Sequence, residues 1–224
     1  MNNHIFAILT GDVVKSSALI PKDRKKLSKT LLRASKYLKT NFAQSIPSNI
    51  DIFRGDSWQL LVSKPEISLK IALILRAFLK IDMNNPKIDT RIAIGIGTID
   101  FLDEYNISAG DGEAFRLSGL ILESIPKDYY MGVALSKNLN YYTSESLDVI
   151  LKLIDYQIKN WTIQQTRAVF GALQNFTQKQ IVKDVFQSSL TQQAVADHLN
   201  KAGWIYIKLA LDFYEESVRN LLHQ

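Results

Sequence analysis

The stretch "IDIFRGDSWQLLVS", residues 50–63, predicts two short strands that are joined by a tight turn. Its two halves, 50–54 and 57–63, are rich in the β-branched and aromatic residues that favour extended structure. Gly55 and Asp56 lie between them, and such a pair is typical of a two-residue hairpin loop, because Gly adopts positive φ at no steric cost. We therefore expect a β-hairpin at this point of the chain.

A strand and a helix precede the hairpin, and a helix and a strand follow it. Residues 4–9 are an apolar run typical of a buried strand, and a helix with one apolar stripe begins at Pro21 and continues to 42. A second helix (65–82) and a strand (90–100) complete a βαββαβ order. In the ferredoxin-like form of this order, the third strand inserts between the first two. A further helix (112–125) and strand (129–136) follow, so the predicted fold class is α+β with the order βαββαβ-αβ.

The strand at 90–100, "TRIAIGIGTID", has two very different faces. Three isoleucines alternate along it with Ala93, Gly95 and Gly97, so one face is strongly apolar and the other is nearly bare. Gly inside a strand marks a place where another segment approaches closely. We therefore expect a close contact on the bare face.

The chain changes character near residue 142. From Ser144 onward the pattern is helical, with no strand-like alternation. The aromatic-rich segment 204–222 predicts an amphipathic helix that packs in the core of this region or against a dimer partner. We therefore predict an α/β domain over 1–142 and an all-helical domain over 143–224.

Composition excludes several classes of protein. The 224 residues are 46% hydrophobic and 22% charged, as in globular proteins, and carry a net charge of +5. The absence of cysteine excludes disulfides and thiolate metal sites and fits a reducing compartment. The most apolar window, 67–81, contains three basic residues and is too short to cross a bilayer, and the first residues do not resemble a signal peptide. We expect a cytoplasmic protein with no membrane partner.

The predicted topology brings Asp12 and Asp56 to one edge of the sheet. Asp12 follows the first strand and Asp56 precedes the third, and these ends are neighbours when the third strand lies antiparallel beside the first. Two close carboxylates repel each other unless a cation bridges them or one is protonated. Oxygen ligands without His or Cys suit Mg²⁺ or Mn²⁺, which are the cofactors that we predict here. The alternative is that each aspartate only caps a turn.

The segment that follows Asp12 has the features of a phosphate-binding loop. "VVKSS" (13–17) leads into a helix and offers backbone N–H groups, an ammonium and two hydroxyls to an anion. A nucleotide or polyphosphate is the ligand that these groups suit. The predicted contacts in this part of the chain are Val13, Val14, Lys15, Ser16, Ser17 and, from the hairpin, Arg54.

Four segments resemble, in order, the signature blocks of the class III nucleotide cyclase domain: "FAILTGDVVKSS" (6–17), "FRGDSWQLLV" (53–62), "RIAIGIGTI" (91–99) and "SAGDGEAFRLSG" (108–119). In that family the first two blocks supply the metal-binding aspartates, which the resemblance places at Asp12 and Asp56. Over nearly the whole chain the sequence is similar to the SatD family of small bacterial proteins. This resemblance implies a nucleotide-cyclase-like fold followed by a small helix-turn-helix-like domain.

Departures from the cyclase pattern imply that this chain lacks part of the catalytic residues of that family. The phosphate-turn glycine is replaced by Lys15, the ribose-orienting asparagine by Arg116 and the transition-state arginine by Leu120. The positions that read the base fall on Ile52 and Gly110, whose side chains form no hydrogen bonds with a base edge. Arg116 is instead either a bidentate phosphate ligand, as we predict, or a solvated helix residue.

The resemblance to the SatD family implies a helix-turn-helix within 176–204. Two helices are expected around "QSSL" (187–190), with Thr177 and either Ser189 or Thr191 as N-caps. The second helix would carry Gln192 and Gln193 toward the major groove, where Gln pairs with adenine edges.

The charge of the tail argues against DNA binding by the tail alone. Residues 143–224 hold eight basic and eight acidic residues, and Lys201 is the lysine of the second helix that could contact a phosphate. Helix 21–42 is the opposite case, because its basic residues have only Asp23 as a nearby acid. This run is either a solvated face or a patch for nucleic acid or polyphosphate. Its members are Lys22, Arg24, Lys25, Lys26, Lys29, Arg33, Lys36 and Lys39.

The leading hypothesis is a regulatory protein in which a metal- and nucleotide-binding cyclase-like domain controls a helix-turn-helix-like domain. A divergent nucleotide cyclase or nucleotidyltransferase is the first alternative, and a scaffold with a vestigial site that binds a protein partner is the second. Whether the chain is an enzyme stays open at this point. Because cyclase-like domains place their sites at a dimer interface, and because strand 90–100 has a bare face, we also expect a homodimer.

Overall fold

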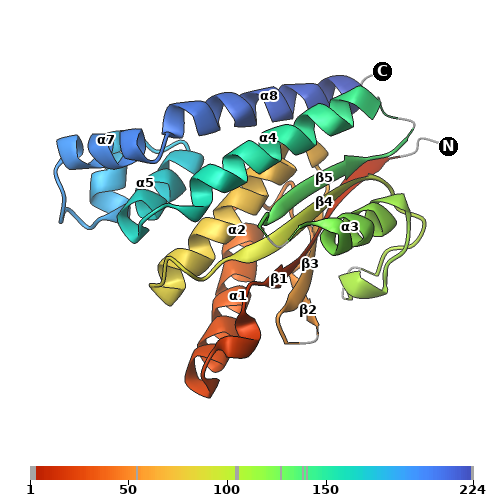
Figure 1. The fold of residues 1–224 in the computed structure, drawn as a ribbon, viewed down its shortest axis with the longest axis horizontal. Helices are drawn as coiled ribbons and strands as arrows, with labels where there is room; N and C mark the ends of the chain where they lie inside the picture. The colour runs from red at the N-terminus through yellow and green to blue at the C-terminus, as the bar shows by residue number, and fades with distance from the viewer. Residues whose placement is uncertain are drawn as a thin grey trace.

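The computed structural model describes residues 4–53, 55–103, 106–126, 128–137, 139 and 141–222. It is a mixed α+β structure with one five-stranded sheet and helices labelled α1 to α8 in these residues (Figure 1). The strands are β1 (Ile5–Val13), β2 (Asp51–Phe53), β3 (Ser57–Val62), β4 (Thr90–Thr98) and β5 (Met131–Leu135). The longer helices are α1 (Pro21–Asn41), α2 (Ser68–Met83), α3 (Glu113–Ser124), α4 (Tyr141–Lys159), α5 (Ile163–Leu173), α7 (Gln192–Lys201) and α8 (Trp204–Leu222).

The strand order confirms the predicted insertion of the third strand. The sheet runs β2-β3-β1-β4-β5, so β3 lies between β1 and β2. β3 is antiparallel to both of these strands, β1 is antiparallel to β4, and β4 is parallel to β5. The first four strands therefore have the ferredoxin-like order, and β5 extends the sheet beyond β4.

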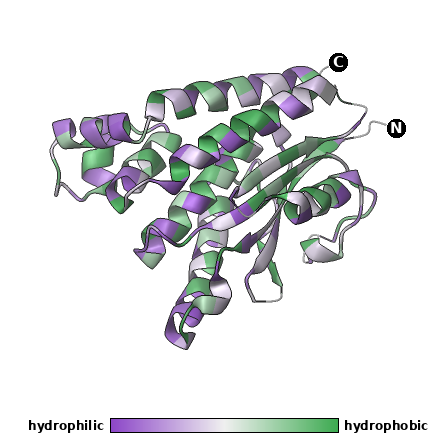
Figure 2. Ribbon diagram, viewed as in Figure 1, coloured by the Kyte–Doolittle hydropathy of each residue, from purple (hydrophilic) through white to green (hydrophobic). Residues whose placement is uncertain are grey.

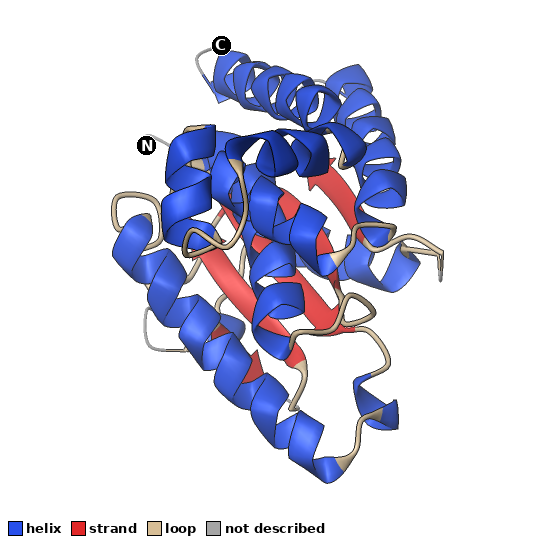
Figure 3. Ribbon diagram, turned by 90° about the vertical axis from the view of Figure 1, so that its left-hand side faces the viewer, coloured by secondary structure: helices blue, strands red, loops and turns tan. Residues whose placement is uncertain are grey.

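Helices cover the two faces of the sheet unequally. Ala7 and Leu9 of β1 point into the main core, which α1, α2 and the tail helices complete. Ile8, one residue away on the opposite face, packs with Leu61 and with Phe115 of α3 in a smaller core. Helices lie in front of the strands when the molecule is viewed from the left-hand side of Figure 1 (Figure 3). The period-two alternation of β1 thus divides the interior between two helical layers.

The bare face of β4 is covered by α3 of the same chain. A Cβ atom built on Gly95 would lie 2.2 Å from the Ala114 carbonyl oxygen and 2.5 Å from the Ser118 nitrogen. The close approach that was expected on this face is therefore made by the backbone of α3. The homodimer stays a prediction, but the strand face that suggested it is occupied within the chain.

The tail is helical, as the sequence predicts, and it shares the main core with the sheet. Val195 and Leu199 of α7 belong to the same cluster of buried residues as Leu9 of β1. The proposed division into domains at 142/143 falls beside the start of α4 and stays a prediction. None of the helices in the described ranges combines the length and apolar character that are needed to cross a membrane.

Two expected helix starts in the tail are confirmed. Thr177 forms a capping box with Gln180 at the start of the short helix α6 (Gln178–Gln180), which continues as a π-helical turn (Ile181–Val185). Thr191 caps α7 by accepting a hydrogen bond from the Ala194 backbone. The turn between these helices contains two consecutive residues with positive φ, Gln187 and Ser188. The helix-turn-helix itself stays a prediction.

The packing of α3 on β4 predicts opposite effects for two glycine substitutions. Gly95→Ala should lower the free energy of unfolding by several kcal/mol, because the new methyl group meets backbone atoms that move only if α3 shifts. Gly119→Ala on the same helix meets nothing within 4 Å and should stabilise the protein by about 0.5–1 kcal/mol through helix propensity. Urea denaturation of both variants tests this, and equal effects would contradict it.

Candidate functional site

Asp12 lies within β1 rather than after it. The strand continues through Thr10-Gly11-Asp12 to Val13, and Asp12 is opposite Ser57 on β3 and Arg91 on β4. Gly11 allows this continuation, because a Cβ atom there would lie 2.4 Å from both the Arg91 carbonyl oxygen and the Trp58 ring. The Gly-Asp pair is thus a close-packed strand position instead of a turn.

Neighbouring side chains fix the backbone at Asp12. The indole N–H of Trp58 donates to the Thr90 hydroxyl at 3.1 Å, and this hydroxyl donates to the Asp12 carbonyl at 2.7 Å. Trp58 and Thr90 are fully buried. The position of Asp12 is therefore set by the core and needs no ligand to maintain it.

The Asp12 carboxylate forms a bidentate ion pair with Arg91. The Arg91 Nε donates to one carboxylate oxygen at 2.8 Å, and its Nη2 donates to the other. Hydrogen bonding to Asp12 raises the pKa of Arg91 despite partial burial. Because Arg91 lies on the face of β4 that carries Ala93 and Gly95, the pair lies on the α3 side of the sheet.

Asp56 lies at the same end of β1 but has a different partner. The Val13 N–H donates to the Asp56 carbonyl oxygen at 3.2 Å, so the hairpin is joined to the end of β1. The Asp56 carboxylate accepts a hydrogen bond from the Ser16 hydroxyl. The structure thus brings Asp12 and Asp56 to one sheet edge, as predicted, and pairs Asp12 with Arg91 and Asp56 with Ser16.

A pocket of about 480 Å³ opens between the loop after β1, the start of α1 and the hairpin. Its polar groups are hydroxyls, two basic side chains and one carboxylate. Arg24 closes one wall, because it donates to the backbone carbonyls of Ser17 and Leu19 at 2.6 and 2.9 Å. The ammonium of Lys25 has no hydrogen bond or ion pair within the described part of the chain. The pocket is lined by Ser16, Ser17, Arg24, Lys25, Leu27, Ser28, Gly55 and Asp56.

The remaining predicted phosphate contacts are dispersed. The Val14 N–H already donates to the Asp89 carbonyl oxygen at 2.8 Å, and Lys15 adopts a left-handed backbone conformation with φ 56°. Arg116 pairs with Asp100 and Asp111, which lie beyond the end of β4 that is opposite Arg91. The structure therefore does not bring Arg116 to the pocket. Arg54 lies outside the described residues.

The donor groups fit a divalent cation only in part. Among the residues that the structure describes, no group of three or more His, Asp or Glu side chains is placed to hold a metal ion. Asp56 and the Ser16 hydroxyl could serve a Mg²⁺ ion whose other ligands are phosphate oxygens and water, which is how Mg²⁺ is usually bound. Asp12 could join them only after its carboxylate has left Arg91.

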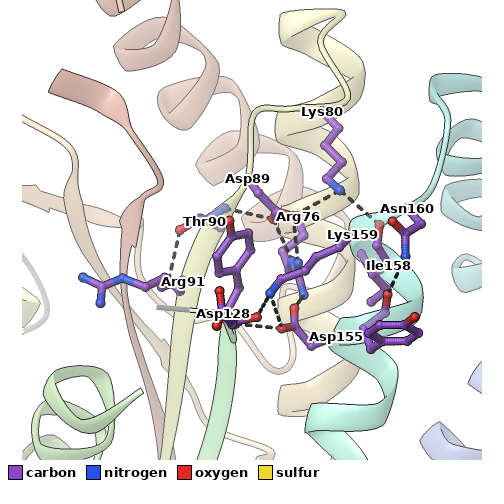
Figure 4. A network of polar contacts seen from close by, with 12 residues as sticks. Arg76, Lys80, Asp89, Thr90, Arg91, Asp128, Asp155, Ile158, Lys159 and Asn160 are labelled. Carbon is purple, nitrogen blue, oxygen red and sulfur yellow. Dashed lines mark hydrogen bonds and ion pairs between the residues drawn. The ribbon is translucent and has the colours of Figure 1, made fainter. Parts of the chain in front are cut away.

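A buried ionic network lies behind this edge of the sheet (Figure 4). Arg76 of α2 donates two hydrogen bonds of 2.7 Å to Asp89 and a third of 2.7 Å to Asp155 of α4. Lys80, one turn further along α2, pairs with Asp89 at 3.1 Å and donates to the Ile158 carbonyl. Arg76 and Asp155 are completely buried, so these charges are satisfied by one another.

The pKa values of Asp89 and Lys80 in this ionic network are both lowered, for different reasons. Burial alone would raise the pKa of Asp89, but the charge and hydrogen bonds of Arg76 and Lys80 hold this pKa below its ordinary value. Burial lowers the pKa of Lys80 by more than the carboxylate of Asp89 raises it. Asp89 is thus held in its charged form, and it stabilises the fold at pH values above the ordinary carboxyl range.

The predicted DNA-contacting residues are all on α7. Gln192 donates to the Gln178 side chain at 3.2 Å, and Gln193 donates to Asp197 at 3.3 Å. Both glutamines and Lys201 are exposed. Gln192 and Gln193 form the first turn of α7, whereas Lys201 ends it.

The sequence contains signals for the polar residues that motif-based prediction missed. Arg91 is separated from Ala93 and Gly95 by an even number of residues, so the alternation of the strand identifies it as the charged member of the bare face. The register of β1 on β4 places it opposite Asp12. Arg76 and Lys80 are four residues apart in the stretch 71–81, whose other residues are all apolar, which indicates a pair of charges that is buried together. No comparable pattern points to Asp155.

Comparison with known proteins gives no family assignment. No family model matches the sequence, and no curated protein matches it. Among solved structures, the chain is similar to the guanylyl cyclase Cya2, with 13% sequence identity and a TM-score of 0.42 over 58% of this chain and 74% of the other. Membership of the SatD family stays a prediction.

The buried ionic network predicts a large decrease in stability when one charge is removed. Asp155→Asn should lower the free energy of unfolding by about 3–5 kcal/mol, because Arg76 keeps its charge without a buried partner at this position. Asp100→Asn removes an exposed ion pair with Arg116 and should change stability by less than about 1 kcal/mol. Equal denaturation midpoints for the two variants would contradict the role of this network.

Proposed function

We propose that this protein is a regulator that binds a nucleotide or polyphosphate, together with Mg²⁺ or Mn²⁺, at the edge of the sheet beside Asp56. Its helical tail would pass the occupancy of this site on to DNA or to a protein partner. The observation that carries the proposal is the pocket between the loop after β1, the start of α1 and the hairpin. It combines hydroxyls, the Lys25 ammonium and the Asp56 carboxylate in about 480 Å³.

The chemistry of this pocket suits phosphate groups bound through a cation. The Ser17 hydroxyl can donate to a phosphate oxygen, and the Ser16 hydroxyl can do so once a cation takes its place at Asp56. Lys25 has no competing partner in the described residues. Asp56 would repel a bare phosphate, but a divalent ion between them turns this repulsion into two favourable contacts. The proposed ligand is therefore a metal–polyphosphate complex rather than a free anion.

The ion pair between Asp12 and Arg91 favours binding over catalysis. A two-metal mechanism needs both carboxylates free to hold cations, whereas Arg91 engages both oxygens of Asp12. Arg116 is also held at the other end of β4 by Asp100 and Asp111. A regulatory domain needs groups that bind the ligand, but it does not need two free metal-binding carboxylates or a catalytic arginine.

We expect the ligand site to depend on Asp56 and to be limited by Arg91. ATP or GTP with Mg²⁺ should raise the melting temperature, since a ligand at about 100 times its Kd stabilises by about 2.7 kcal/mol. Asp56→Asn should abolish the Mg²⁺-dependent part of this shift. Arg91→Gln should strengthen Mg²⁺ binding, because Asp12 then becomes available to the ion.

Differential scanning fluorimetry with and without EDTA measures these shifts. Asp100→Asn is the matched control, because it removes an exposed carboxylate far from Asp56. An equal Mg²⁺ shift in wild type and Asp56→Asn would refute the metal site. No shift with any nucleotide or with inorganic tripolyphosphate would refute the ligand class.

DNA binding by the tail and by α1 can be separated through salt dependence. Lys29, Lys36 and Lys39 are exposed on one side of α1 and have no ion pair in the described ranges. Replacing them by Ser should flatten the log–log salt slope by about 0.9 for each phosphate that is no longer neutralised and weaken all sequences alike. Gln192→Ala with Gln193→Ala should instead reduce discrimination between sequences and leave the slope unchanged.

Fluorescence anisotropy on a DNA pool, before and after selection for binding, provides both readouts. If α1 supplies the affinity, only the lysine variants bind the unselected pool more weakly. If wild-type protein binds no DNA at low salt, the DNA arm of the proposal fails and a protein partner remains.

A further inference from the structure

The outer sides of α4 and α8 carry the largest group of exposed apolar side chains in the described residues. Seven large side chains on these two helices are between 48% and 75% exposed. We call them the α4–α8 surface. Its members are Val149, Leu153 and Tyr156 on α4, and Ile205, Tyr206, Leu209 and Phe213 on α8.

The two helices lie side by side, so their exposed residues form one surface. α4 and α8 are in contact and run in opposite directions along one side of the molecule (Figure 1). Where they meet, Gln157 and Trp161 donate to the Ala202 carbonyl at 3.2 and 3.0 Å. Hydrophobic residues recur along both helices in Figure 2.

The spacing shows that these residues share one side of each helix. Val149, Leu153 and Tyr156 are separated by four and three residues, as are members of one helical stripe. Buried residues such as Leu151 and Ile158 lie on the opposite side of α4. The helices therefore have a second apolar face in addition to the one that packs in the core.

The size of the α4–α8 surface matches half of a stable protein interface. A fully enclosed aromatic side chain buries about 150–250 Å² and an aliphatic one less, so the exposed fractions of these seven residues amount to roughly 800 Å². Monomeric proteins rarely expose more than about 300–600 Å² of contiguous apolar surface. About 800 Å² is the contribution of each partner to an interface of standard size.

The charged residues around the α4–α8 surface would attract a charged partner only weakly. Lys208 pairs with Asp212 at 2.5 Å along α8, and Lys152 pairs with Asp148 at 2.7 Å on α4. Both pairs are closed within the chain, and Glu216, seven residues after Leu209 on the same side of α8, adds one exposed negative charge, so no basic cluster borders the surface. An anionic membrane or a strongly charged peptide would gain little electrostatic energy there.

The row on α8 is arranged symmetrically about Leu209. Ile205 and Phe213 lie four residues before and after it, on the same side of the helix. When two copies of this row meet in antiparallel orientation around a two-fold axis, Leu209 faces Leu209 and Ile205 faces Phe213. The same surface is then complementary to itself, as an isologous interface requires.

We propose that the α4–α8 surface binds a second copy of this chain and forms a two-fold symmetric homodimer. The α4 and α8 helices of the two copies pack as a four-helix arrangement with Leu209 near the axis and Leu153 and Tyr156 at its sides. This inference is independent of nucleotide binding, because none of these residues lines the pocket at Asp56.

Light scattering after size-exclusion chromatography tests the dimer. At a protein concentration of tens of micromolar, the wild type should have twice the mass of one chain, because an interface of standard size forms a stable complex. Leu153→Glu with Leu209→Glu should give a folded monomer, because both side chains are exposed and a charge there costs the single chain little. Leu120→Glu, at 64% exposure on α3, is the matched control and should remain dimeric.

A single cysteine tests the orientation, since the natural chain contains none. Leu209→Cys should form a disulfide between two chains under mild oxidation, whereas Leu120→Cys should not. A wild-type monomer, or a dimer that survives the double Glu substitution, would overturn the proposal. A monomer that co-sediments with neutral phosphatidylcholine vesicles would overturn it in favour of a lipid surface.

Discussion

The contacts of Arg76 connect the sheet to the helical tail. This guanidinium is fully buried in α2 and binds Asp89, directly before β4, and Asp155 in α4. Because an unpaired charge is costly inside a protein, the three segments must come together for any of them to be buried. Apolar packing alone would allow α4 to slide along the sheet, whereas Asp155 accepts hydrogen bonds of 2.7 Å from Arg76 and from the Tyr130 N–H, and these fix the position of α4.

The same network borders the candidate ligand site. The Asp89 carbonyl accepts the Val14 N–H, and the neighbouring Thr90 hydroxyl holds the Asp12 carbonyl. Figure 4 shows Arg91, two residues after Asp89, pointing away from the network. A ligand that moved the loop after β1 would therefore act on Asp89, and through Arg76 on Asp155 of α4. The proposed regulator thus has a chain of direct contacts from its pocket to the helix that begins its tail.

Much of the fold follows from local patterns in the sequence, and the site follows only in part. The hairpin at Gly55, the alternation along β4 and the cap at Thr191 are set by neighbours in the chain, so each was predictable. The continuation of β1 through Asp12 was not, because it depends on Trp58 and Arg91, which crowd Gly11 from other strands. The placement of Arg116 was also beyond the pattern, since Asp100 and Asp111 engage it from a loop without a regular period.

The ion pair between Asp12 and Arg91 is compatible with the regulatory role that we propose for this edge of the sheet. An aspartate at the end of a buried strand needs a positive charge nearby, and either a cation or a guanidinium can supply it. With Arg91 in this role, β1 and β4 are joined at their ends whether or not a ligand is present. The Asp56 carboxylate accepts a hydrogen bond from only the Ser16 hydroxyl in the described part of the chain, and it is the group to which our proposal assigns an exchangeable cation. One carboxylate thus stabilises the sheet while the other stays available, and this division of roles lets the proposed pocket fill and empty without disturbing the fold.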